Sequence, residues 1–197
     1  MKSKHIYILF SIILMFTACK EHYTPKKNAY YRLSFPTTKT LTTYQNNTCP
    51  FSFQYPNYWI VQKDSNDLQE LSNHPCWFNL VVPEHKVKIY FSYTAIDANN
   101  TLDKLVKDSY KMSFKHAIKA DYIDDIPFKT KNNVEGVMYD VGGNAASGLQ
   151  FYLTDSIQHF LRGSLYFYNT PNYDSIAPAF DYFSKDVDII VNSFTWQ

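Results

Sequence analysis

The N-terminal segment constrains this chain most, because it has the order of parts of an export signal rather than of a folded element. Lys2 and Lys4 precede an almost wholly apolar run over residues 6–16, and Thr17-Ala18-Cys19 follows it. The run of about 11 residues is well short of the ~20 that a membrane-spanning helix needs, so a retained transmembrane anchor is the weaker interpretation. We expect residues 1–18 to be removed and to take no part in the fold.

A cysteine directly after a small residue distinguishes a lipoprotein signal from an ordinary one. Cys19 follows Ala18, and only a thiol takes the thioether-linked lipid. Cys19 is therefore the predicted lipidation site, and plain secretion with a free thiol is the alternative. Two or more acyl chains hold a protein durably at a membrane. No sustained acidic run follows Lys20-Glu21, which predicts the periplasm-facing leaflet of the outer membrane.

The mature part has the size of one ordinary domain. Residues 19–48 are polar, with scattered proline, threonine and asparagine, and are expected to form a lipid-anchored tether and an extended lead-in. Residues 49–197 are expected to form a single globular domain. Without Lys2 and Lys4, the mature part has 17 basic and 18 acidic residues. This balance gives no excess of positive charge that could attract nucleic acid.

The periodicity of the domain predicts an α+β fold. Strand composition recurs at 51–55, 76–82, 87–94, 123–129, 134–141, 149–154 and 159–168. Asn100-Thr101 is expected to cap a helix over 102–119, and a terminal helix is expected to start at 171–174. Hairpin connections rather than regular strand-helix-strand alternation favour an antiparallel sheet flanked by helices, and bulk on both faces of 149–154 suits a sheet covered on both sides. The 17 tyrosines and 15 phenylalanines are assigned to its core rather than to a carbohydrate-binding surface.

The two remaining cysteines suggest a disulfide. Cys49 and Cys76 form an even pair in an oxidising envelope compartment, and their bridge is expected to stabilise the domain by roughly 3 kcal/mol. Two buried free thiols are the second interpretation. A zinc site is disfavoured, because the sequence lacks the paired Cys or His spacing that zinc sites show.

No motif in the sequence carries strong catalytic or cofactor chemistry. Asp155, Ser156 and His159 have the residue types of a hydrolytic triad, but they lie around one predicted turn without a Gly-x-Ser-x-Gly context. Gly142-Gly143 lacks the Lys-Ser/Thr of a phosphate-binding loop, and the scattered histidines show no metal-ligand spacing. We therefore expect no catalytic residues, no metal and no cofactor.

A small cationic patch is the best candidate for an interaction site. It would arise if the 102–119 helix packs on the hairpin of 149–168, and its residues are Lys115, His116, Lys119 and Arg162. Solvated helix charges and a satisfied histidine remain the alternative.

The motifs of the mature chain, taken in order, resemble the gliding-motility lipoproteins called GldD. The resembling residues are Tyr23-Thr24-Pro25, 49–56, Cys76-Trp77, Asp108-Ser109-Tyr110, Lys115-His116, Lys119-Ala120, 150–156, 159–163 and 171–176. They cover nearly the whole mature chain. Residues 51–59 and the terminal helix running into Ser193-Phe194 are similar to PsbP-like domains, which implies an α-β-α sandwich.

The resemblance implies a non-enzymatic envelope lipoprotein needed for surface gliding and for adhesin export and display by the type IX route. It implies partners among other gliding-machinery or type IX secretion proteins, and it brings no catalytic residues. The competing interpretations are a lipoprotein that binds a small ligand or glycan and an envelope hydrolase.

Overall fold

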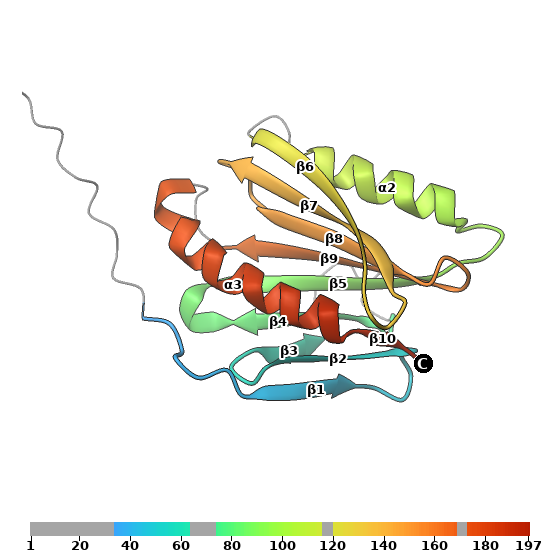
Figure 1. Cartoon of the computed structure of the whole chain (residues 1–197), viewed down its shortest axis with the longest axis horizontal. Coiled ribbons are helices and arrows are strands. Elements are labelled where there is room, and N and C mark those ends of the chain that lie inside the picture. Colours follow the sequence, from blue (N-terminus) through green and yellow to red (C-terminus); the bar gives the residue numbers. More distant parts are fainter. Residues whose placement is uncertain (1–33, 64–73, 116–119, 169–172) are drawn as a thin grey trace, which may run out of the picture. The chain divides into compact units, whose positions relative to one another are not determined.

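The computed structural model describes residues 34–63, 74–115, 120–168 and 173–197, and within these ranges the strands form two antiparallel sheets (Figure 1). The larger sheet has the order β3-β4-β5-β9-β8-β7-β6. Its strands are β3 (Ile60–Lys63), β4 (Trp77–Val82), β5 (Val87–Ala95), β9 (His159–Phe167), β8 (Leu149–Thr154), β7 (Glu135–Gly143) and β6 (Ala120–Lys129). The smaller sheet has the order β1 (Leu41–Gln45), β2 (Phe51–Pro56) and β10 (Thr195–Trp196). A short 3-10 turn, η1 (Pro83–His85), separates β4 from β5.

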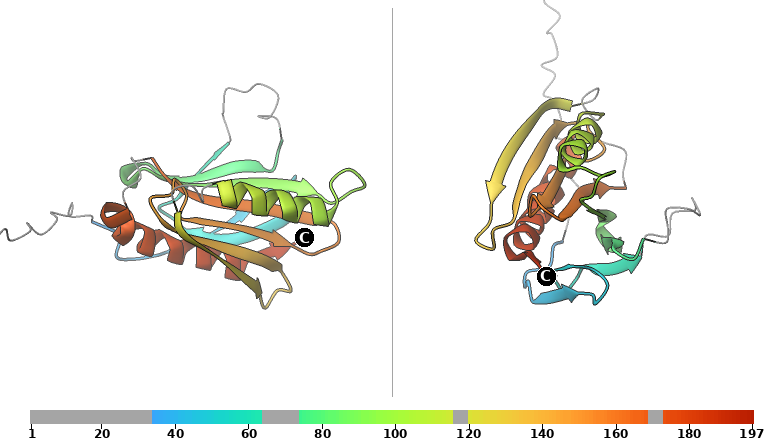
Figure 2. Two further views of the ribbon diagram at one scale, coloured as in Figure 1. Left: turned by 90° about the horizontal axis from the view of Figure 1, so that it is seen from above. Right: turned by 90° about the vertical axis from the view of Figure 1, so that its right-hand side faces the viewer.

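Helices cover both faces of the larger sheet (Figure 2). Phe151 on β8 lies in the main core with Phe183 of α3 (Tyr173–Ser193), whereas its neighbour Tyr152 lies in a second core beneath α2 (Leu102–Phe114). Successive strand residues point to opposite faces, so every residue of β8 is buried. The predicted α+β class, with an antiparallel sheet between helices, is confirmed.

Aromatic side chains build the main core. The Tyr44 ring stacks on Phe78 with centroids 4.5 Å apart, and Phe78 stacks on Phe91 at 4.8 Å. Gly163 is required opposite Phe151, because a Cβ at this position would lie 2.1 Å from the ring. The abundance of aromatic residues is therefore explained largely by packing between the two sheets and α3.

The folded domain starts earlier than the predicted boundary at Cys49. β1 pairs with β2 over Leu41–Gln45, and Tyr44 is buried in the main core. Phe35 also packs against this core. The sequence did not predict this contribution, because residues 19–48 are mostly polar and only single side chains of the lead-in, such as Phe35 and Tyr44, pack into the core.

Three short or polar strands, β1, β3 and β10, carry too little periodic signal to be predicted. The helix expected over 102–119 is observed as α2, capped by the Thr101 side chain, which accepts from the Lys104 backbone N–H. Residues 116–119 of that prediction lie outside the described residues, as do Cys19 and the signal segment.

The structure joins Cys49 and Cys76 by a disulfide with Cα atoms 5.5 Å apart. This separation lies within the range that a bridge requires. Both residues are buried, Cys49 in the turn before β2 and Cys76 directly before β4. The bridge therefore ties the smaller sheet to the larger one.

Candidate functional site

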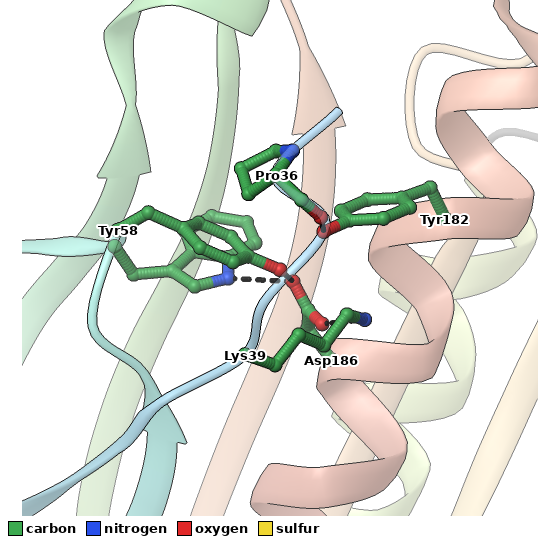
Figure 3. Close-up of polar contacts among 6 residues, drawn as sticks. Pro36, Lys39, Tyr58, Tyr182 and Asp186 are labelled. Carbon is green, nitrogen blue, oxygen red and sulfur yellow. Dashed lines mark hydrogen bonds and ion pairs between the residues drawn. The ribbon is translucent and has the colours of Figure 1, made fainter. Parts of the chain in front are cut away.

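The carboxylate of Asp186 is the most heavily bonded buried charge that the described residues contain, and it fastens the lead-in to the terminal helix (Figure 3). Asp186 lies on α3 and is fully buried. Its Oδ1 is 2.5 Å from Lys39 Nζ, and its Oδ2 accepts from Trp59 Nε1 at 2.9 Å and from the Tyr58 hydroxyl. A charge removed from water needs such partners to remain ionised without a large cost.

Tyr182, one turn before Asp186, adds a second attachment for the lead-in. Its hydroxyl donates to the Pro36 carbonyl at 2.7 Å, and its ring stacks on Phe35 with centroids 4.5 Å apart. The Lys39 ammonium also lies 4.3 Å from the centre of the Tyr182 ring, within cation-π range. The segment that connects the domain to the predicted lipid anchor is thus held on α3 by apolar, polar and ionic contacts.

Tyr58 stays a neutral donor in this site. Burial raises the pKa of the Tyr58 phenol above its ordinary value, and the hydrogen bond to Asp186 raises it further. Both effects disfavour the phenolate, because a phenolate beside a buried carboxylate would be poorly solvated and would be repelled by that negative charge. The group of Lys39, Tyr58, Trp59, Tyr182 and Asp186, here called the lead-in clamp, therefore suits mechanical attachment better than proton transfer.

A row of polar side chains crosses the opposite face of the larger sheet, and α2 packs over its part on β8 and β9. The strand register aligns Asn79, Tyr90, Ser164, Gln150 and Tyr139 on five neighbouring strands. All of these residues except Tyr90 are buried. Three of the buried side chains, those of Asn79, Ser164 and Gln150, are polar and offer little apolar surface. Within the described structure, Gln150 Nε2 and Ser164 Oγ have no hydrogen-bond partner, so this row is a polar layer inside an otherwise packed interface.

Arg162 of the predicted patch belongs to this polar layer. Its guanidinium donates to Gln150 Oε1, which also accepts from Ser113 Oγ of α2 at 3.3 Å. Burial lowers the pKa of Arg162, and no carboxylate among the described residues lies within ion-pair distance of it. Lys115 is exposed at the end of α2.

The structure thus places Arg162 under α2 and Lys115 at the C-terminal end of the same helix. His116 and Lys119 lie outside the described residues, so the four-residue patch stays a prediction.

The residues with triad chemistry form a turn. Asp155 Oδ1 accepts from the backbone N–H groups of residues 157, 158 and 159, each at 2.9 Å. Partial burial opposes ionisation of Asp155, but these three donors hold its pKa below the ordinary value. His159 Nδ1 pairs with the Tyr93 hydroxyl at 2.8 Å, and Ser156 Oγ donates to Glu135. The three side chains have separate partners, as the turn interpretation predicts.

Neither a metal centre nor a membrane span is found in the part of the chain that the structure describes. Its histidine, cysteine and acidic side chains do not gather in groups of three or more that could hold a metal ion. Among the same residues, no helix is long and apolar enough to cross a bilayer.

The family of the chain follows from a comparison over almost its whole length. A family model described as gliding motility lipoprotein GldD matches residues 20–196. The chain belongs to the GldD family. The matched region begins directly after Cys19 and includes the lead-in clamp as well as the polar row. No curated protein matches the chain.

A solved structure confirms the PsbP-like fold that the sequence predicted. The chain is similar to the solution structure of cyanobacterial PsbP (CyanoP) from Synechocystis sp. PCC 6803, with 14% identity and a TM-score of 0.50. The similarity covers 84% of this chain and 99% of that chain. At this identity the likeness shows the fold alone.

The sequence prediction for this GldD chain missed the clamp. Asp186 stands three residues after Phe183 and four before Ile190, within the apolar stripe of α3. A charged residue in such a stripe signals a buried polar partner, and this signal was available from the sequence. Its partner Lys39 was not, because it lies 147 residues away in a polar segment.

Proposed function

We propose that this GldD-family lipoprotein is a non-enzymatic component of the gliding machinery that holds other envelope proteins at the periplasm-facing leaflet of the outer membrane. In this role it is needed for adhesin export and display by the type IX route. Membership of the family supports the motility role. The lipid on Cys19 supplies the attachment to the membrane.

The docked lead-in is the observation that carries this proposal. Lys39 and Pro36 are bound to α3, so the lead-in is attached to the domain at these positions. Even a fully extended chain between Cys19 and Ser34 reaches only about 50 Å. A folded domain joined to its tether by a buried ion pair stays close to the membrane and transmits load, which suits a docking component.

The alternative of a glycan-binding or ligand-binding lipoprotein rests on the aromatic content. The rings of Phe51, Phe53 and Phe151 are fully buried, and they pack between layers instead of lining an open groove. This arrangement supports the docking role over the alternative.

Deletion of the gene tests the machinery role. We expect cells without the protein to stop gliding and to lose adhesins from their surface, with recovery when the gene is restored. Deleted cells that glide and display adhesins normally would contradict the proposal. Protein with an aromatic pocket occupied by a co-purified ligand would favour the alternative.

The membrane arrangement is tested separately with a Cys19→Ser variant. Serine does not take the thioether-linked lipid, so we expect the variant to remain unprocessed or to be released in soluble form. Membrane-bound variant with wild-type mobility would contradict lipidation. Protease treatment of intact cells should leave the domain uncut, whereas rapid digestion would place it on the cell surface.

A further inference from the structure

Strand β6 forms one edge of the larger sheet. β6 pairs with β7 along its length, and no other described strand pairs with it (Figure 1). Most of its residues are exposed, including Tyr122 at 46% and Ile126 at 51%. An edge strand presents backbone N–H and C=O groups with which another extended chain can pair.

This edge carries negative charge on both faces. Asp124 and Asp125 are consecutive and therefore point to opposite sides of the sheet. Neither aspartate, nor Asp121, forms an ion pair with another described residue. Across the strand pair, Asp140 faces Asp124, and burial together with this like charge raises the pKa of Asp140. A positive side chain approaching the edge would relieve this repulsion.

We propose that β6 docks, by strand addition between Tyr122 and Ile126, an extended segment of another envelope protein that carries two adjacent lysine or arginine residues. The inference rests on the proposed docking function and names the chemistry of the partner. Adjacent basic residues on the added strand alternate between faces, so each meets one of the two aspartates. Apolar residues beside them cover Tyr122 and Ile126.

Two features of β6 set the limits of the docking stretch. Pro127 has no backbone N–H to donate, and the register with β7 is irregular between Ala120 and Tyr122. Charges on an edge often serve only to prevent strand pairing. Between Tyr122 and Ile126 the charges have one sign, so this stretch repels a second copy of itself and acidic segments while attracting basic ones.

Peptide binding to the full lipidated chain in detergent tests this inference. The probe is a synthetic peptide with Lys-Lys at the centre of alternating valine and threonine, and its control has Glu-Glu instead. We expect the lysine peptide alone to bind, to slow amide hydrogen exchange in β6, and to bind more weakly at high salt. The paired change Asp124→Lys and Asp125→Lys should weaken binding on the order of tenfold.

A matched variant controls for the change in net charge. Asp103→Lys with Asp108→Lys reverses two exposed carboxylates on α2 and should leave peptide binding unchanged. Equal binding of the glutamate peptide, unchanged binding by the β6 variant, protection away from β6, or self-association of the chain through β6 would each overturn the inference.

Gliding assays separate this inference from the proposed function. If deletion stops gliding while the folded β6 charge-reversal variant glides like wild type, the docking edge is wrong and the machinery role stands. If deletion leaves gliding intact, the machinery role fails, and the peptide assay still decides whether β6 binds a basic strand.

Discussion

Replacing Asp186 by alanine removes one buried acceptor from three donors at once. The Trp59 indole N–H is left in a buried position, where an unsatisfied donor costs about 1 to 3 kcal/mol. The Tyr58 hydroxyl is half-buried and adds about 1 kcal/mol. The Lys39 side chain is 27% exposed and can turn toward water, so its contribution is small.

The free energy of unfolding should therefore fall by about 3 kcal/mol, near the lower end for breaking a buried ion pair. Urea denaturation followed by tryptophan fluorescence measures this loss. Asp181→Ala removes an exposed carboxylate from the same helix, and its effect should stay within about 0.5 kcal/mol.

A double-mutant cycle isolates the pair itself. Lys39→Met leaves the Asp186 carboxylate buried without its counter-ion, so the single changes should be clearly non-additive, with a coupling of about 1 kcal/mol or more. The Asp186→Ala variant should also become sensitive to protease before β1, because the lead-in loses its attachment to α3. Additive single changes, or equal losses for Asp186→Ala and Asp181→Ala, would refute the assignment of the clamp.

Two further predictions concern stability. Cys49→Ala should lower the free energy of unfolding by about 3 kcal/mol, because the bridge to Cys76 spans a separation of 27 residues, and reduction of the wild type should do the same; free thiols titrating in the unreduced folded protein would contradict the bridge. Burial raises the pKa of Tyr139 to about 12 and raises that of Tyr58 as well, so the folded state favours their neutral forms. The stability that these two neutral phenols contribute to the folded state is present below pH 10, and it should be lost as the pH rises from 10 through their raised pKa values. Tyr58→Phe should reduce this alkaline loss of stability in thermal unfolding measurements.

Local pattern was enough to predict the parts of the fold in which one face of an element repeats regularly. The alternation in β5 and β8 and the three-to-four spacing in α3 led directly to the α+β class, because these periods belong to strands and helices. The turn at Asp155 was also predictable, since an aspartate in a turn can accept the following backbone N–H groups. β3 has four exposed residues and no such period, so nothing in the sequence indicated it.

The sequence by itself predicted an export signal with Cys19 and determined the element types and the balance of charge, because each depends on neighbouring residues or on a sum. Only the tertiary structure decided which distant residues meet. Lys39 reaches Asp186 because the lead-in and α3 cover the same face of the sheet, and Gln150 meets Ser164 because the register of β8 against β9 aligns them. Such pairings depend on how whole layers pack, since the free energy that selects them comes from the buried core and not from the residues that form the site.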